Sequence, residues 1–297
     1  MKLLITGASG FIGTVLTRRL LDAQHQVVGL SRTPDRLQSK FAGQFRAVKS
    51  LAEIDAAEDI DAIVNLAGEP ILGKRWSLAQ KQRIYTSRLD TTAAVLQLIR
   101  RLDKPPGVLV NGSAIGFYGS QPGDRVLDEQ SEGRPGFTHK LCADWENKAL
   151  EAQQQGVRVC LLRTGVVLGD GGALKRMLPP FRCALGGPIG NGRQWFSWIH
   201  LEDMVSAIEF LLAHEVLTGV FNATAPTPVT NAAFTQALGR ALRRPVVLPM
   251  PSFLLRLMLG EGAELLCEGQ RVIPARLLDA GLEFSYPDID KALSSLL

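Results

Sequence analysis

Three glycines near the start of the chain have the spacing that a diphosphate-binding turn requires. The segment TGASGFIG (6–13) places Gly7, Gly10 and Gly13 between an expected strand and an expected helix. Gly7 permits a tight turn, Gly10 lets the backbone approach a pyrophosphate, and Gly13 allows close packing of helix on strand. The first helical amides then offer N–H donors and a positive dipole end to the phosphates. This pattern predicts dinucleotide binding rather than a merely tight structural turn. The residues expected to contact the dinucleotide are Gly7, Ala8, Ser9, Gly10, Phe11, Ile12 and Gly13.

The end of the next expected strand indicates which dinucleotide is bound. An acidic residue there would accept hydrogen bonds from a ribose 2′-hydroxyl and would repel a 2′-phosphate. The strand ends instead with Ser31 and Arg32, and a guanidinium beside a hydroxyl suits a phosphate group well. We therefore predict NADP(H), with a solvent-facing arginine in a turn as the alternative for Arg32.

The elements that must position these residues alternate along the first half of the chain. Short apolar runs alternate with amphipathic segments, which is typical of βαβ units and a parallel sheet. Strands are expected at 2–6, 26–31, 61–68 and 107–114, a further strand with its exit loop at 157–169, and helices at 9–22 and 77–102. Near the end, a strand and turn at 220–230 lead into a helix whose N-cap is Thr230 or Asn231.

We predict an α/β fold with a Rossmann-like, doubly wound parallel sheet and a smaller, mostly C-terminal α/β substrate region. After residue 168 the sequence becomes rich in Gly and Pro, which marks an excursion over one end of the sheet. The predicted dinucleotide-binding domain is 1–168, to which the segment around 198–223 returns. The predicted substrate region is 169–297, including an appended small domain at about 249–295.

The composition excludes several classes of function. The chain has 297 residues and a formal net charge of +4, with its basic residues scattered, so we expect no nucleic-acid partner. The four cysteines are far apart, with no CxxC and no histidine at zinc spacing. This favours reduced thiols in a cytoplasmic protein and no metal site. No run approaches the roughly 18 apolar residues of a membrane span, so we expect no membrane partner.

Further motifs resemble the extended short-chain dehydrogenase/reductase superfamily, which contains sugar-nucleotide epimerases and dehydratases. Its GxxGxxG segment is present, and WIHLEDMVSAI (198–208) resembles its I-H-V-x-D element. VNLAG (64–68) resembles the loop that lies along the cofactor, and LLRTGVVLG (161–169) the strand that reaches the nicotinamide. NGSAIGFYG (111–119) resembles the serine-rich strand end, which maps the catalytic serine onto Ser113. The other residues expected at the cofactor are Leu66, Ala67, Gly68, Glu69 and Arg163.

A finer resemblance is to the nucleoside-diphosphate-sugar epimerase family with an extra C-terminal domain. RWSLAQKQRIYTSR (75–88), CADWE (142–146) and the segment 259–293 carry it, and the last resembles a short appended domain of unknown function. The family implies a small-molecule substrate, with sugar nucleotides among the candidates. Many relatives pair through a four-helix contact, which implies a homodimer by analogy.

The acid/base pair of the working members is missing from this chain. They carry Tyr-x-x-x-Lys on the helix after the serine strand, and the lysine lowers the pKa of the tyrosine so that the phenol exchanges a proton. Alignment on Glu146 places Thr138 and Cys142 at the two positions. Shifted registers do not restore the pair, since they offer Phe137 or His139 and Leu141 or Ala143.

A second departure lies on the long helix expected at 77–102. The resemblance implies a structural asparagine there that supports a water chain to the lysine. The segment reads TSRLDTT (86–92), with Arg88 at or near that position. The two replacements fit together, because an asparagine that serves a lysine has no role once the lysine is gone.

Each remaining candidate has a structural alternative. Ser113 would bond a substrate oxygen or be a strand-end hydroxyl, and Arg163 would meet the nicotinamide or a substrate anion, or form an ion pair. Glu69 would face the cofactor or be a solvated loop carboxylate. The readings we favour for the others are structural: loop packing for Tyr118, a packed thiol for Cys142, and an i,i+4 partner of Asp144 for Lys140. Three tryptophans would line a pocket or be buried in the core: Trp76, Trp195 and Trp198.

Two functions follow from these observations. The first is an NADP(H)-binding atypical oxidoreductase or epimerase-like enzyme on an unidentified substrate, with relocated or weakened acid/base chemistry. Hydride transfer does not itself demand the tyrosine, because the cofactor carries the hard step. The second is a non-catalytic NADP(H)-dependent binding or sensing protein whose partner docks through the C-terminal region.

Overall fold

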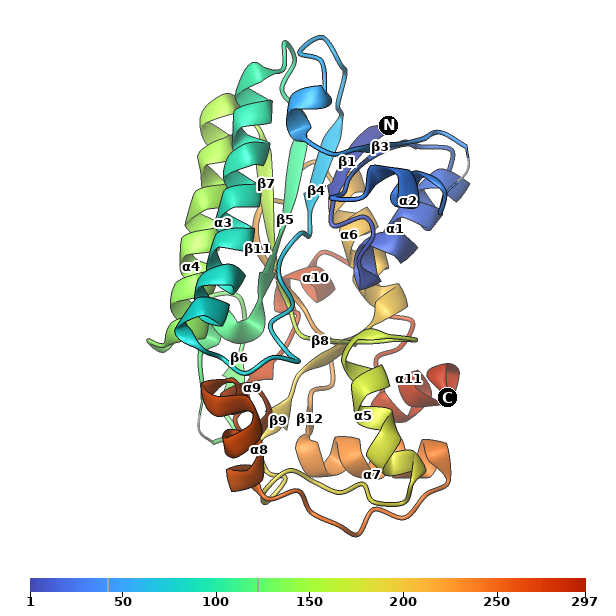
Figure 1. Cartoon of the computed structure of the whole chain (residues 1–297), viewed down its shortest axis with the longest axis vertical. Coiled ribbons are helices and arrows are strands. Elements are labelled where there is room, and N and C mark those ends of the chain that lie inside the picture. Colours follow the sequence, from blue (N-terminus) through green and yellow to red (C-terminus); the bar gives the residue numbers. More distant parts are fainter. Residues whose placement is uncertain (42, 122) are drawn as a thin grey trace.

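A seven-stranded parallel sheet forms the centre of the molecule (Figure 1). The computed structural model describes residues 1–41, 43–121 and 123–297. The strand order is β11-β7-β5-β4-β1-β2-β3, so the Rossmann-like fold predicted from the sequence is confirmed. The strands are β1 (Lys2–Thr6), β2 (Gln26–Leu30), β3 (Phe45–Val48), β4 (Ala62–Asn65), β5 (Val108–Ala114), β7 (Arg158–Thr164) and β11 (Gly219–Ala223).

The direction in which strands are added reverses next to β1. From β1 the chain adds β2 and β3 on one side, and then returns to place β4 on the other side, where Leu3 pairs with Ala62. At such a switch point the loops that follow two neighbouring strands diverge, and a crevice opens beyond their carboxyl ends. Here these loops begin at Gly7 and Leu66, the two segments in which the sequence predicted cofactor contacts.

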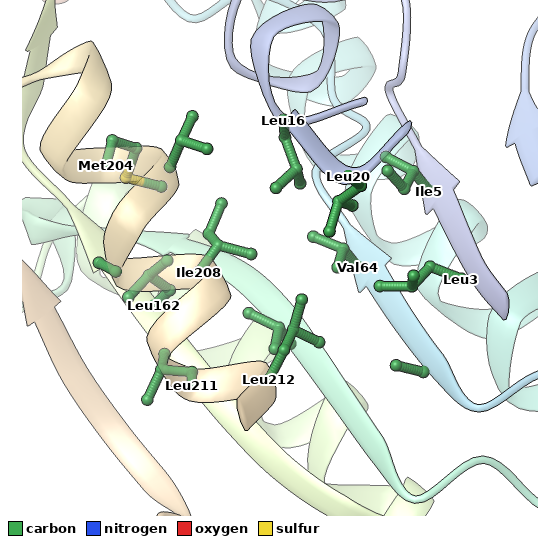
Figure 2. Close-up of a cluster of buried hydrophobic side chains, with 14 of the residues drawn as sticks. Leu3, Ile5, Leu16, Leu20, Val64, Leu162, Met204, Ile208, Leu211 and Leu212 are labelled. Carbon is green, nitrogen blue, oxygen red and sulfur yellow. The ribbon is translucent and has the colours of Figure 1, made fainter. Parts of the chain in front are cut away.

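Helices cover both faces of the sheet (Figure 1). On one face, α1 (Phe11–Asp22) and α6 (Leu201–Ala213) pack side by side. Figure 2 shows their leucine, isoleucine and methionine side chains converging on strand residues such as Ile5 and Val64. On the other face lie α3 (Leu78–Arg101) and α4 (Phe137–Leu150). The strands are therefore buried on both sides, which explains why each reads as an almost continuous apolar run.

Short connecting elements complete this half of the molecule. They are α2 (Pro34–Gln38) and the 3₁₀ helices η1 (Leu51–Glu53), η2 (Ile115–Tyr118) and η3 (Glu151–Gln155). The expected helix at 9–22 begins at Phe11, because Gly10 is its extended N-cap. Of the two N-caps proposed for the late helix, Thr230 is the one observed, and its side chain accepts a hydrogen bond from the Ala233 amide.

A second layer of structure lies beyond the carboxyl ends of the strands, in the lower half of Figure 1. Its core joins α5, α7 and α11 through Leu174, Phe181, Phe234, Leu238 and Leu293. Its strands are β6 (Val126–Leu127), β8 (Val166–Leu168), β9 (Trp195–Phe196), β10 (Trp198–His200), β12 (Val229–Thr230) and β13 (Arg271–Val272). Its helices are α5 (Gly172–Arg182), α7 (Asn231–Leu242), α8 (Ser252–Leu259), η4 (Gly260–Ala263), α9 (Glu264–Cys267) and α11 (Ile289–Leu296), whereas α10 (Ala275–Asp279) packs against β11 of the sheet.

The C-terminal segment is tied back to the sheet half by long-range contacts. The Arg276 guanidinium of α10 donates hydrogen bonds to the carbonyl of Val220 in β11 and of Thr218 just before it, while β13 pairs in parallel with β6 within the second layer. Within the part of the chain that the structure describes, no helix is both long and apolar enough to cross a membrane.

Candidate functional site

The glycine turn between β1 and α1 has the geometry of a phosphate cradle. Gly7 has a φ of 74°, in the left-handed region, and its carbonyl accepts a hydrogen bond of 2.8 Å from the Gly10 amide. A Cβ at Gly13 would collide with the Gly7 carbonyl oxygen, so helix and turn can approach this closely only with glycine there. The start of α1 has no side-chain cap and no acidic residue in its first turn. Its positive dipole end is therefore free to receive an anion.

One cavity of about 700 Å³ extends from this turn into the second layer. The loops after β1, β4, β5 and β7 all contribute to its wall, as expected at a switch point. Of the residues predicted at the site, the cavity is lined by Gly7, Gly10, Phe11, Ile12, Gly13, Leu66, Gly68 and Ser113. The other predicted residues lie outside the lining, and their contacts stay predictions: Ala8, Ser9, Ser31, Arg32, Ala67, Glu69 and Arg163.

The two residues predicted to select NADP(H) lie at the end of β2. The Ser31 hydroxyl accepts a hydrogen bond of 3.1 Å from the Thr33 amide, and the Arg32 side chain is exposed. The pKa of Glu69 is lowered mainly by its hydrogen bonds from Lys74 and Gln80, and Arg32 adds a smaller electrostatic effect. A free guanidinium is thus available beside this loop.

Ser113 is tied to a buried charge network. Its hydroxyl donates a 2.6 Å hydrogen bond to Oε1 of Glu146, a residue on α4 that is only 5 % exposed. Arg163 binds the same carboxylate through Nε at 2.9 Å and Nη2 at 2.8 Å. Of the two roles predicted for Arg163, the structure shows the ion pair. Because Ser113 gives its hydrogen to Glu146, its oxygen can act toward the cavity only as an acceptor.

Tyr118 belongs to the same network and has a packing role. Its hydroxyl accepts a 3.2 Å hydrogen bond from Arg163 and donates one of 2.7 Å to Asn222. The side chain is fully buried, and burial raises its pKa to about 12. The phenol therefore holds its proton at neutral pH and contributes to the core rather than to proton transfer.

The helix that should carry the acid/base pair offers no substitute. Thr138 and Cys142 are both nearly buried at the cavity wall. Burial, followed by the charge of Glu146, raises the pKa of the Cys142 thiol to about 11. The thiol is therefore protonated near neutral pH and is a poor nucleophile. Lys140 forms a 2.7 Å pair with Asp144 and is 70 % exposed, and His139 Nδ1 lies 2.6 Å from the Phe117 carbonyl oxygen.

Arg88 is a site residue that sequence reasoning did not include. Its side chain lines the cavity, stacks over Trp145 and packs against Gly68. Nη1 donates 3.0 Å hydrogen bonds to the carbonyls of Glu69 and Ile84. Burial lowers the pKa of Arg88, and no carboxylate in the described parts of the chain forms an ion pair with it. The sequence feature that could have indicated this role is the arginine at the position where the family resemblance implies an asparagine.

The tryptophans divide between cavity and core. Trp195 lines the cavity, and its indole N–H donates a 3.1 Å hydrogen bond to Asp124. Trp76 and Trp198 are buried outside the lining. Only one of the three therefore faces the space where a ligand would lie.

Comparisons with known proteins agree with this geometry. The sequence model of the NAD dependent epimerase/dehydratase family matches residues 3–223, and a domain of unknown function (DUF1731) matches residues 250–296. The chain is 42% identical to the chloroplastic SDR39U1 homolog of Arabidopsis thaliana, an epimerase family protein, over 100% of this chain and 87% of that one. It is 36% identical to the epimerase family protein YfhF of Bacillus subtilis, over 100% and 98%.

A solved structure is similar over the whole chain. The crystal structure of human epimerase family protein SDR39U1 (isoform 2) with NADPH superposes with a TM-score of 0.90 at 36% identity. The alignment covers 100% of this chain and 99% of the human one. The likeness therefore includes both the sheet and the C-terminal layer.

Proposed function

Because the chain belongs to the NAD dependent epimerase/dehydratase family, we propose that its cavity binds NADP(H) and that it is an atypical oxidoreductase of this family. The observation that carries the proposal is the position of the cavity, which begins at the uncapped glycine turn and continues past Ser113. The human relative crystallised with NADPH supports the choice of dinucleotide. An epimerase-like reaction would use the same hydride chemistry.

The residues that would hold the cofactor fit its chemical groups. The amides after Gly10 would receive the diphosphate, and glycine at positions 7, 10 and 13 lets the turn, the loop after β4 and the start of α1 pack closely around it. Ser31 and Arg32 would receive a 2′-phosphate, because Arg32 is exposed and forms no ion pair with any described carboxylate. Leu66 and Gly68 would lie along the cofactor in the loop after β4.

Two residues would act on the reacting oxygen of the substrate. NADP(H) would supply or accept the hydride, so the protein must control the charge on that oxygen. Ser113 would accept a hydrogen bond from a substrate hydroxyl, because its own hydrogen is bound to Glu146. Arg88 would donate hydrogen bonds to a substrate carbonyl and stabilise negative charge there. Since a guanidinium keeps its proton, the proton would be exchanged with water.

A second candidate is supported by the surface of α8. Four apolar side chains in this helix are exposed: Phe253, Leu254, Leu257 and Met258. Clustered exposed apolar residues are typical of protein docking surfaces. We therefore keep the proposal of a non-catalytic NADP(H) sensor whose partner binds the C-terminal region. Oxidation of bound NADPH by any metabolite would favour the enzyme, whereas a co-purifying protein released by Phe253→Ser would favour the sensor.

The oligomeric state and the cellular location of the protein are two further proposals. We propose a homodimer from the family resemblance alone, with pairing through α3 and α4. We also propose a cytoplasmic location, because the four cysteines are free. Light scattering on the purified chain and fractionation of its native cells test these two proposals.

The choice of NADP(H) over NAD(H) is tested by the substitution Arg32→Ala. Removing one charged phosphate contact should weaken NADPH binding roughly 10- to 100-fold and leave NADH binding almost unchanged. Dissociation constants from NADPH and NADH fluorescence titrations measure this preference. Arg18→Ala, an exposed arginine on α1, is the matched control and should change neither constant. Equal affinity of the unaltered chain for both dinucleotides would contradict the assignment.

A further inference from the structure

The half of the cavity that lies in the second layer has walls unlike those of a polar sugar site. The helices α5, α7 and α9, the strand β9 and the loop between α5 and β9 supply most of its side chains, and more of these are apolar than polar. Representative lining residues are Met177, Phe181, Leu185, Phe196 and Leu265. Such a wall favours binding of an apolar ligand, because burying apolar surface away from water contributes about 25 cal/mol per Å². The uncharged polar side chains of this half already form hydrogen bonds within the protein, which leaves fewer of them for a ring of hydroxyl groups: Gln194, Asn231, Thr235 and Gln270.

The charges on the cavity wall have an uneven distribution. Among the lining side chains that the structure describes, Arg88 is the one cation, and it lies at the sheet end beside Gly68. The second-layer end carries two carboxylates, Glu264 and Glu268. Burial raises the pKa of Glu264, and the charge of Glu268 raises it further. An anionic ligand placed there would add another unfavourable charge.

Two cations on the wall-forming helices α3 and α5, which lie outside the lining themselves, have partners. Lys81 forms an ion pair with Glu261. Arg176 donates a 2.9 Å hydrogen bond to the Leu72 carbonyl. Burying a diphosphate without compensating cations or donors costs several kcal/mol per charge. The second-layer half of the cavity, which is lined by two carboxylates and by no cation among the described residues, therefore disfavours a nucleoside diphosphate.

We infer that the substrate of this cavity is a mainly apolar carbonyl or alcohol compound without a diphosphate group, whose one oxygen function meets Arg88 and Ser113. The inference rests on the proposed function, because it assigns the sheet end of the cavity to NADP(H). It narrows the substrate class and sets aside the nucleotide sugars that the family name suggests. The apolar body of the substrate packs against α5 and α9, and its oxygen points toward the end of β5.

Calorimetric titrations of the NADPH-loaded chain test the inference. The probes are 4-phenylbutan-2-one and octan-2-one as apolar ketones, and UDP and UDP-glucose as nucleoside diphosphates. We expect saturable binding of at least one ketone and no heat from either nucleotide. Binding of UDP or UDP-glucose, or failure of both ketones to bind, would overturn the inference. Failure of NADPH itself to load would be seen first, and it would count against the proposed function.

A charged substitution on the cavity wall supplies a second readout. Leu185 lines the cavity and is 59% exposed, so Leu185→Lys should not disturb folding. It should weaken ketone binding roughly tenfold, because it places a hydrated ammonium on the apolar wall. Val216→Lys, at a remote site that is 87% exposed, is the matched control and should leave ketone binding unchanged. If the two substitutions weakened ketone binding equally, Leu185 would not be part of the wall that binds the substrate.

Discussion

At the scale of single residues, the site has the predicted serine but lacks the tyrosine and lysine that the family resemblance implies. Ser113 is present, but its hydrogen is committed to Glu146. The positions that would carry a phenol and an amine hold Thr138 and Cys142, neither of which transfers protons near neutral pH. The cation that faces the cavity comes instead from Arg88 on α3. The chain therefore has a guanidinium at the cavity wall but no tyrosine to act as the acid.

The catalytic role proposed for Arg88 predicts a loss of turnover when its charge is removed. Arg88→Met keeps an apolar side chain over Trp145 but removes the donors to the substrate oxygen. We expect kcat for NADPH oxidation to fall roughly 10²- to 10³-fold, with a smaller change in KM. Steady-state kinetics with an accepted ketone measures both constants, and Arg83→Met, exposed on the same helix, is the control. An unaltered kcat would remove Arg88 from the mechanism.

The buried pair between Glu146 and Arg163 predicts a large effect on stability. Glu146→Gln preserves shape but leaves the guanidinium without a counter-charge, which costs about 3–5 kcal/mol in the free energy of unfolding. Lys140→Met breaks an exposed pair on the same helix and should cost about 1 kcal/mol or less. Urea denaturation of both variants measures the difference. If the two losses were equal, the network would not be a structural support of Ser113.

At the scale of elements, features fixed by residues close together in the sequence were predictable, and pairings between distant segments were not. Strands such as β1 and β5 were predictable because parallel strands buried on both faces are continuous apolar runs. The N-cap Thr230 was predictable because a cap is a local contact. The pairing of β13 with β6 was not, because these two-residue strands lie more than 140 positions apart along the chain. No local pattern records such a contact.

The N-terminus of α6 makes stability depend on pH. His200 accepts a hydrogen bond from the Glu202 amide, stacks on Tyr286, and is 3% exposed. Burial lowers its pKa from 6.5 to about 4. Between these values the unfolded chain binds a proton that the folded chain does not, so the contribution of His200 to stability is lost as the pH falls.

His200→Asn tests this dependence, because asparagine keeps the cap but does not titrate in this range. From about pH 7 to about pH 5, the variant should lose less unfolding free energy than the unaltered chain. Urea unfolding at the two pH values measures the difference. His214→Asn, at the exposed end of α6, is the matched control. Parallel pH profiles for the unaltered chain and His200→Asn would contradict the interpretation.

At the scale of the whole molecule, the cavity lies between the sheet and the second layer, and only the sheet side of it was predictable from the sequence. The glycine turn between β1 and α1 was predictable, because one short segment carries all three of its glycines. The apolar half of the cavity was not predicted, because α5, β9 and α9 converge there from distant parts of the chain. Glu146 served only as an alignment marker, although it holds both Ser113 and Arg163. Its role appears only once α4 is packed against β5 and β7.

The central claim is that the turn from Gly7 to Gly13 binds the diphosphate of a nicotinamide dinucleotide. Isothermal titration calorimetry of the ligand-free chain with NADPH tests it most directly. We predict one saturable site per chain, and loss of the heat in Gly10→Val, whose Cβ would lie 3.0 Å from the Gly7 carbonyl oxygen and crowd the turn that should receive the phosphates. A folded, ligand-free chain that produced no heat with either NADPH or NADH would contradict the account.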